Sequence, residues 1–161
     1  GDRRNRTLLE TGQSSQYVVP VEVSINEPIG ADENLNIGGG RSLRVGTLED
    51  IVAEKLRAFL QQKGEIRNRT RPQDLLDIAY LLHRGKPLNL DEVSRFLQAK
   101  AEARDVPVSK EAFRNPELAR RANHEYEQLR NTVRVPEDFV PFDGAIKLLY
   151  GLVERLDIPE R

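Results

Sequence analysis

The stretch Thr47-Leu48-Glu49-Asp50-Ile51-Val52-Ala53-Glu54-Lys55-Leu56-Arg57-Ala58-Phe59-Leu60 marks the point at which the sequence changes from a strand-like to a helical pattern. Its apolar residues recur with the 3.6-residue period of an amphipathic helix. Thr47 is a favourable N-cap, and Asp50 stands where a capping box has its acidic residue. Gly64 is of the residue type that commonly ends a helix. The stretch therefore predicts a helix that begins at Thr47 and stops at Gly64.

Lys55 is the most informative residue of this helix, because it falls in the middle of the apolar face. At about 100° per residue, Ile51 and Phe59 flank it one turn away on either side. Removing an ammonium group from water is costly, so an inward lysine predicts a carboxylate partner or an anionic ligand. In the alternative interpretation, the aliphatic stem packs on the helix and the ammonium reaches solvent at its edge.

A second helix is predicted after a basic loop. Pro72 suits the first helical position, and apolar residues recur as far as His83, before Gly85-Lys86-Pro87 closes the helix. Asp74 and Asp77 lie three residues apart on one face, which makes them natural partners for the inward lysine. For Asp74 a local role is also open, because the helix dipole favours an acid in the first turn.

The residues before Thr47 predict a small β element. Tyr17 to Ile25 is rich in β-branched residues and reads as a strand, with Pro20 placing it at an edge or a bulge. Asn26 to Arg41 contains several glycines and predicts a loop. Ser42 to Val45 predicts one more short strand.

Helices are also predicted for most of the remaining chain. The apolar pattern fits helices over 90–103, 116–130 and 144–156, with a short one over 109–115. The predicted fold class is α+β, with a short β element followed by a helical bundle. We expect the β-containing residues 1–46 and the helical residues 47–161 to form two domains.

Composition limits the classes of function. The 161 residues carry 25 basic and 26 acidic side chains, so any phosphate binding must be local. There is no cysteine, which excludes disulfides and thiol nucleophiles. No apolar run approaches the roughly 20 residues of a membrane span, which predicts a cytoplasmic protein without a membrane partner. The chain starts at Gly1 and has no methionine, so we expect a processed or truncated product of a longer gene.

The two predicted helices together resemble those of the AbiEii/AbiGii-type nucleotidyltransferase toxins, which include the MenT toxins. The resemblance rests on the quoted stretch around Lys55 and on Arg71-Pro72-Gln73-Asp74-Leu75-Leu76-Asp77, and it extends from the Tyr17 strand to near the end. It implies a polymerase-β-like nucleotidyltransferase fold. In that fold a mixed sheet binds a nucleoside triphosphate and magnesium ions, and a helical C-terminal region closes the site.

The resemblance also implies roles for single residues. Lys55 matches the lysine that contacts the triphosphate, and Asp77 or Asp74 matches a late acidic residue of the catalytic site. Glu22 matches a third acidic position and would be the metal-side carboxylate. The family's Gly-Ser motif with its two magnesium-binding acids is missing, because no acidic pair follows Gly12 to Ser15 at short range.

A basic loop precedes the second helix. Arg67, Arg69 and Arg71 lie next to a helix N-terminus, where backbone N–H groups and the helix dipole favour anions. They therefore predict a contact with phosphate or with tRNA. The alternative is a solvated loop without a ligand.

Two functions remain as hypotheses. In the first, the chain is the C-terminal part of a magnesium-dependent nucleotidyltransferase toxin from a toxin–antitoxin or phage-defence locus. It would transfer a nucleotide from a nucleoside triphosphate to RNA, with tRNA as the expected acceptor, and would pair with a cognate antitoxin. Because the Gly-Ser motif is missing, we expect the chain alone to be inactive. In the second, it is a non-catalytic helical module that binds an antitoxin or nucleic acid.

Overall fold

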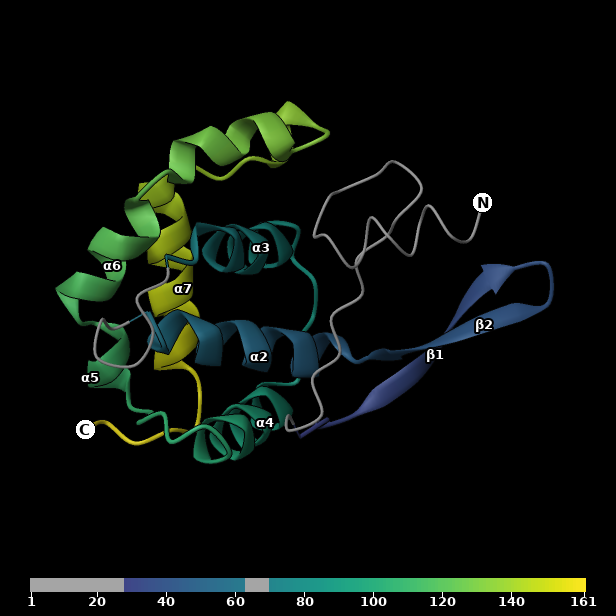
Figure 1. Ribbon diagram of the computed structural model, residues 1–161, viewed down its shortest axis with the longest axis horizontal. Helices are drawn as coiled ribbons and strands as arrows, with labels where there is room; N and C mark the ends of the chain where they lie inside the picture. The colour runs from purple at the N-terminus through teal and green to yellow at the C-terminus, as the bar shows by residue number, and fades with distance from the viewer. Residues whose placement is uncertain (1–27, 63–69) are drawn as a thin grey trace, which may run out of the picture.

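Two strands precede a set of helices in the computed structural model, which describes residues 28–62 and 70–161 (Figure 1). This order confirms the predicted α+β fold class. The division into two domains after residue 46 stays a prediction. The described elements are β1 (Asp32–Gly38), β2 (Arg41–Gly46), α2 (Leu48–Leu60), α3 (Pro72–His83), α4 (Leu90–Glu102), α5 (Lys110–Phe113), α6 (Pro116–Asn123), the 3-10 helices η1 (Tyr126–Thr132) and η2 (Pro136–Asp138), and α7 (Phe142–Glu154).

β1 and β2 form an antiparallel hairpin that projects from the helical body as an arm (Figure 1). The loop predicted from Asn26 to Arg41 is therefore wrong over β1, whereas the strand predicted from Ser42 to Val45 is confirmed within β2. Gly38, Gly39 and Gly40 all have positive φ. Tight hairpin turns require such angles, and glycine adopts them without steric cost. The glycine triplet is the turn that joins the two strands.

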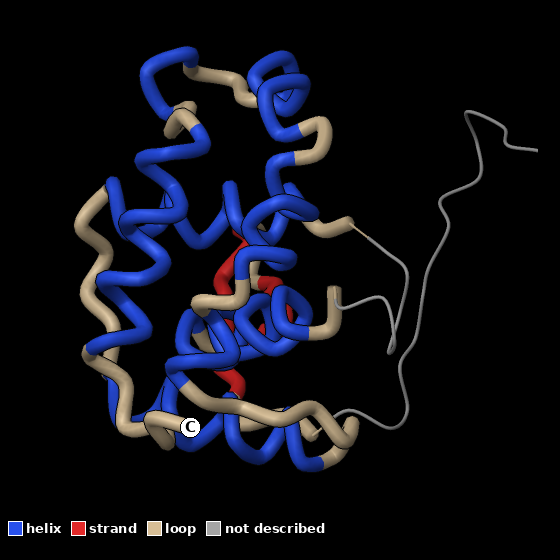
Figure 2. The backbone as a smooth tube through the Cα atoms, turned by 90° about the vertical axis from the view of Figure 1, so that its left-hand side faces the viewer, coloured by secondary structure: helices blue, strands red, loops and turns tan. Residues whose placement is uncertain are grey.

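One face of the arm carries exposed apolar side chains. Leu35 lies opposite Leu43 in the strand register, and Ile37 follows Leu35 on the same face. Figure 1 shows the hairpin extending beyond the helices, and in Figure 2, turned by 90°, the strands are partly hidden behind them. The strand predicted from Tyr17 to Ile25 lies outside the described residues.

Hydrogen bonds to backbone and side-chain oxygens tie the base of the arm to the start of α2. Thr47 N–H donates to the Ala31 carbonyl at 3.1 Å, and Gly30 N–H donates to Asp50 Oδ1 at 2.7 Å. Asp50 N–H donates to the Thr47 hydroxyl oxygen, which confirms Thr47 as the N-cap. The capping box is not reciprocal, because the Asp50 carboxylate accepts from Gly30 instead. Asp50 therefore links the arm to the helix.

Gly30 is a position where a side chain does not fit. An added Cβ would lie 2.4 Å from Cδ1 of the buried Phe96 ring and 2.7 Å from Asp50 Oδ1. We expect Gly30→Ala to lower the free energy of unfolding by about 1–3 kcal/mol, because the Phe96 ring must move. Urea denaturation measures the change. Gly151→Ala in α7 is the control, since its added Cβ has no atom within 4 Å; equal stability of the two variants would contradict this packing.

α2 is the central helix of the body. It packs against α4 on one side and α3 on the other, and α7 packs on α3 (Figure 1). The Phe59 ring is fully buried and stacks on Phe113 of α5, with ring centroids 6.4 Å apart. α2 ends at Leu60, before Gly64, which lies outside the described residues. α2 therefore buries most of its residues and leaves Ile51 exposed.

The helix predicted from Pro116 to Arg130 is wrong in its second half. α6 ends at Asn123, and Glu125 has a φ of 61°, in the left-handed region. η1 then begins at Tyr126, whose fully buried side chain donates a hydrogen bond to the Val140 carbonyl at 2.9 Å. The break directs the aromatic ring into the core.

The other predicted helices are confirmed, with small shifts of their ends. The ends of α4, α5 and α7 lie within two residues of the predicted limits, and α3 begins at Pro72 as predicted. None of the helices in residues 28–62 and 70–161 is long and apolar enough to cross a membrane.

Candidate functional site

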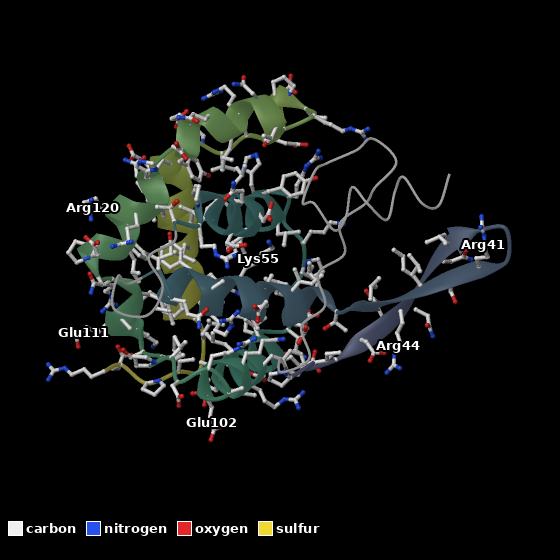
Figure 3. All side chains as sticks on the ribbon, in the orientation of Figure 1. Arg41, Arg44, Lys55, Glu102, Glu111 and Arg120 are labelled. Carbon is white, nitrogen blue, oxygen red and sulfur yellow. The ribbon has the colours of Figure 1, made fainter. Side chains whose placement is uncertain are left out.

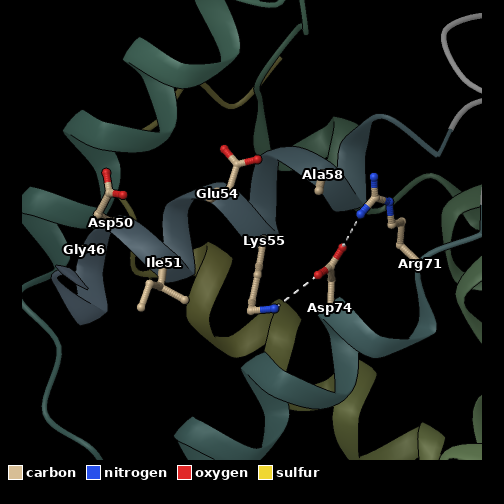
Figure 4. Close-up of a pocket in the computed structure, with 8 residues that line it drawn as sticks. All are labelled: Gly46, Asp50, Ile51, Glu54, Lys55, Ala58, Arg71 and Asp74. Carbon is tan, nitrogen blue, oxygen red and sulfur yellow. Dashed lines mark hydrogen bonds and ion pairs between the residues drawn. The ribbon is translucent and has the colours of Figure 1, made fainter. Parts of the chain in front are cut away.

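A pocket of about 360 Å³ lies over the exposed side of α2 (Figure 4). We call it the α2 pocket. In Figure 4, Asp50 and Glu54 project from one edge of α2, while Lys55 projects toward Asp74 of α3 at the other edge. The pocket therefore has an acidic edge and a mixed edge. Its lining residues are Gly46, Asp50, Ile51, Glu54, Lys55, Ala58, Arg71 and Asp74.

The ion pairs predicted for Lys55 are confirmed. Its ammonium Nζ lies 2.6 Å from Asp77 Oδ2 and 3.2 Å from Asp74 Oδ1, both on α3. Burial tends to lower the pKa of Lys55, but the hydrogen bonds and charges of Asp77 and Asp74 outweigh burial and raise the pKa above its usual value. Lys55 therefore stays positively charged at physiological pH and suits a role as a fixed cation.

The position of Lys55 on α2 differs from the predicted one. The helix buries Val52, Leu56 and Phe59 in the core, whereas Ile51 is 39% exposed and lines the α2 pocket. The Lys55 side chain, 22% exposed, lies at the boundary between these two faces. Placing Lys55 at the centre of a buried face is therefore wrong. Figure 3 shows it between α2 and α3, while the other labelled charged side chains lie at the periphery.

Asp74 and Asp77 differ in their surroundings. The side chain of Asp74 is 13% exposed and that of Asp77 is 52% exposed. Oδ2 of Asp74 is buried and lies 3.6 Å from Arg71, an ion-pair distance too long for a hydrogen bond. Among the described residues this oxygen has no hydrogen-bond partner, so it can accept one. Asp74 is thus the enclosed partner of Lys55, and Asp77 is the solvated one.

Arg71 is the described member of the predicted basic loop, and it lines the α2 pocket. Its backbone N–H donates to Oε1 of the buried Gln62 at 2.7 Å, and Gln62 Nε2 donates to the Phe59 carbonyl. Gln62 thereby fixes the start of α3 against the end of α2. Arg67 and Arg69 lie outside the described residues.

Gln62 was not predicted as a site residue. A glutamine just beyond a helix end is ordinary in a sequence, and only the fold shows that it holds a cation-bearing residue in place. Its position directly before a loop was the available signal, but it does not distinguish this glutamine from its neighbour Gln61.

The negative charge of the acidic edge is offset by cations that do not line the pocket. Lys100 of α4 lies 3.0 Å from Asp50 Oδ1 and 4.0 Å from Glu54 Oε2, and Arg57 pairs with Glu54. Lys100 also was not predicted. Its place on the buried face of α4, at helical spacing from Val93, Phe96 and Leu97, is the signal that could have indicated it.

The described residues contain no cluster of three candidate metal ligands among their histidine, aspartate and glutamate side chains. Asp74 and Asp77 share the ammonium of Lys55 instead. Glu22, the expected metal-side carboxylate, lies outside the described residues. Among the described residues, the side chains of the α2 pocket therefore include two cations, Lys55 and Arg71, and no cluster of three metal-ligand candidates.

The fold and the site together define a class of protein. It is an α+β protein in which a lysine is held between two carboxylates beside a surface pocket. A family model described as nucleotidyl transferase AbiEii toxin, type IV toxin–antitoxin system, matches residues 1–146. The chain belongs to this family of nucleotidyltransferase toxins. No curated protein and no solved structure matches the chain significantly.

Proposed function

We propose that the α2 pocket binds the phosphates of a nucleoside triphosphate, and that the protein transfers a nucleotide from it to RNA, with tRNA as the expected acceptor. The observation that carries this proposal is the position of Lys55. It lies at the edge of the pocket, charged and held between Asp74 and Asp77. Membership of a nucleotidyltransferase family supports the triphosphate as the ligand.

The chemistry of the pocket agrees with a phosphate site. A lysine ammonium has three N–H donors, and among the described residues Asp74 and Asp77 accept from it. A third donor is then available for a phosphate oxygen. Arg71 adds a second cation at the start of α3, where the helix dipole also favours an anion. Positive charge held in advance near a reacting phosphate stabilises the transition state.

Magnesium, an antitoxin partner and a cytoplasmic location belong to the same proposal. Magnesium would neutralise the charge that develops on the phosphates. The described residues contain no cluster of three candidate ligands for it, and Glu22 is the proposed metal-side carboxylate. Family membership supports the antitoxin as a partner.

A transfer assay tests the proposed function. The full-length protein is incubated with magnesium, each of the four labelled nucleoside triphosphates and total RNA, and the label is followed into RNA and into protein. Label in RNA, and in tRNA after fractionation, is the expected result. Label in protein alone would contradict the proposed acceptor. Absence of label from both, with tight binding of an antitoxin, would support the non-catalytic binding module.

Asp77→Asn tests how the lysine is held. A hydrogen bond to a charged group contributes about 1.5–3 kcal/mol, so we expect the transfer rate to fall about 10-fold to 100-fold. The free energy of unfolding should change little, because the Asp77 side chain is half exposed. The measurement is the initial rate in the transfer assay. An unchanged rate would show that Asp74 alone positions Lys55.

A further inference from the structure

Lys100 is a buried lysine outside the predicted site. Its side chain is 5% exposed, and its Nζ donates to the Pro28 carbonyl at 2.8 Å and lies 3.0 Å from Asp50 Oδ1. Glu54 Oε2 is within 4.0 Å. A lysine is almost never buried to this extent unless its ammonium is paired.

The partners of Lys100 are pocket residues. Asp50 and Glu54 form the acidic edge of the α2 pocket, opposite Lys55 (Figure 4). The pocket lining holds three acids, Asp50, Glu54 and Asp74, against two cations, Lys55 and Arg71. The acidic edge would repel a polyphosphate in this pocket unless nearby cations outside the lining offset its negative charge.

We propose that Lys100 is a positioning residue of the phosphate site, which acts through Asp50 and Glu54. It neutralises Asp50 from the α4 side and adds to the positive charge that Arg57 supplies at Glu54. Through Pro28 and Asp50 it also holds the base of the arm against α2. The inference rests on the proposed function, because it requires that the α2 pocket binds phosphates.

The first experiment uses Lys100→Met in the full-length protein. At an effective dielectric constant of about 20, one unit of charge at roughly 10 Å changes the binding of another by about tenfold. We therefore expect the Kd for inorganic tripolyphosphate, and the KM for the nucleoside triphosphate, to rise about tenfold or more, with kcat changed far less. Because Lys100 does not touch the reacting phosphates, an equal fall in kcat would contradict the proposal, as would unchanged values of Kd and KM.

The second experiment tests whether removing a negative charge compensates for the loss of Lys100. Asp50→Asn removes the carboxylate that Lys100 neutralises, while the amide oxygen can still accept from Gly30 N–H. The double variant Lys100→Met/Asp50→Asn should therefore recover most of the lost affinity. A double variant as weak as Lys100→Met would mean that the loss has another cause and would overturn the proposal.

Lys100→Met could fail to fold, because it leaves Asp50 buried without its cation. In that event Asp50→Asn is compared with the double variant, neither of which contains this carboxylate. The proposal then requires weaker tripolyphosphate binding by the double variant, because Lys100 still offsets Glu54 in the single one. Equal affinities would overturn it.

Two further variants complete the test. Lys110→Met is the matched control, because Lys110 forms an ion pair with Glu160 at 2.7 Å and does not line the pocket. This variant should bind tripolyphosphate as the wild type does. Lys55→Ala separates the inference from the proposed function. If Lys55→Ala binds tripolyphosphate normally, the α2 pocket is not the phosphate site and both fall. If it loses binding while Lys100→Met does not, the proposal for Lys100 alone is wrong.

Discussion

Lys55→Ala in the full-length protein is expected to lower the rate of nucleotide transfer by about 10²–10³. Losses of this size are usual when one preorganised electrostatic contact to a reacting group is removed. The raised pKa of Lys55 keeps its charge constant across the physiological range, so the loss should be similar from about pH 6 to pH 9. Initial rates of label transfer over this range measure both features.

The stability of Lys55→Ala is expected to change by less than about 1 kcal/mol. The variant loses two ion pairs, but the half-exposed Asp77 can be solvated. Asp74 is about as buried as Asp50, and unlike Asp50 in Lys100→Met it keeps a second cation, Arg71, at 3.6 Å. Alanine is also the best helix former, and the desolvation cost of the lysine disappears. Urea denaturation of the wild type and the variant gives the difference.

Lys110→Ala is the control for this prediction. Lys110 is also a mostly buried lysine in an ion pair, with Glu160, but it lies on α5, which contributes no residue to the α2 pocket. Its rate of transfer should equal that of the wild type. If Lys55→Ala transfers nucleotides normally and is less stable by several kcal/mol, Lys55 is a structural ion-pair member. The binding-module hypothesis would then be preferred.

The ion pair of Lys55 with Asp74 and Asp77 could be predicted because it depends on local periodicity. One helix carries a cation near its apolar face, and the next helix carries two acids on one face. These side chains meet when the two helices pack side by side. The cost of leaving the ammonium unpaired limits the possible arrangements further. The functional roles of these three residues stay predictions, since ion pairing alone does not define them.

The exposure of Ile51 could not be predicted in the same way. Helical periodicity shows which residues share a face, but not how wide a strip the neighbouring helices cover. α3 and α4 cover α2 from two sides, and the remaining strip contains Ile51. One turn later on the same strip, Lys55 is therefore accessible at the pocket edge rather than enclosed.

Strand β1 shows a different limit. Leu35 and Ile37 alternate with asparagines, which is a strand pattern, but the three following glycines suggested a long loop. Paired residues on the opposite strand complete the hairpin, and that pairing is not a property of either segment alone. Lys100 was missed for a related reason, because its partners Asp50 and Glu54 lie about 50 residues earlier in the chain.

Phe59→Ala is expected to have the largest effect on stability, a loss of about 3–5 kcal/mol in the free energy of unfolding. The ring is fully buried, and it stacks on Phe113 at 6.4 Å between centroids with an interplanar angle of 16°. α5 is a single turn, and the stacking of Phe113 on Phe59 is a contact of that helix with α2. Urea denaturation should show a lower midpoint with an unchanged slope.

Tyr80→Ala is the aromatic control for this prediction. Tyr80 is exposed on α3, with the Arg84 guanidinium 5.8 Å from its ring centroid, so its removal should cost about 0.5–1 kcal/mol at most. If Phe59→Ala costs no more than Tyr80→Ala, the ring of Phe59 is not part of the core and the packing of α2 against α5 is wrong.

Phe59 and Lys55 are one helical turn apart, and their variants should give opposite results. Phe59→Ala should transfer nucleotides at close to the wild-type rate at temperatures where it stays folded, because the ring does not line the α2 pocket. Lys55→Ala should stay folded, and its rate of nucleotide transfer should fall. At four residues' separation the two positions are close enough to couple, so the double variant can depart from additivity in stability. A large loss of the transfer rate in folded Phe59→Ala would mean that the position of Lys55 depends on the packing of the next turn of α2, which contains Phe59.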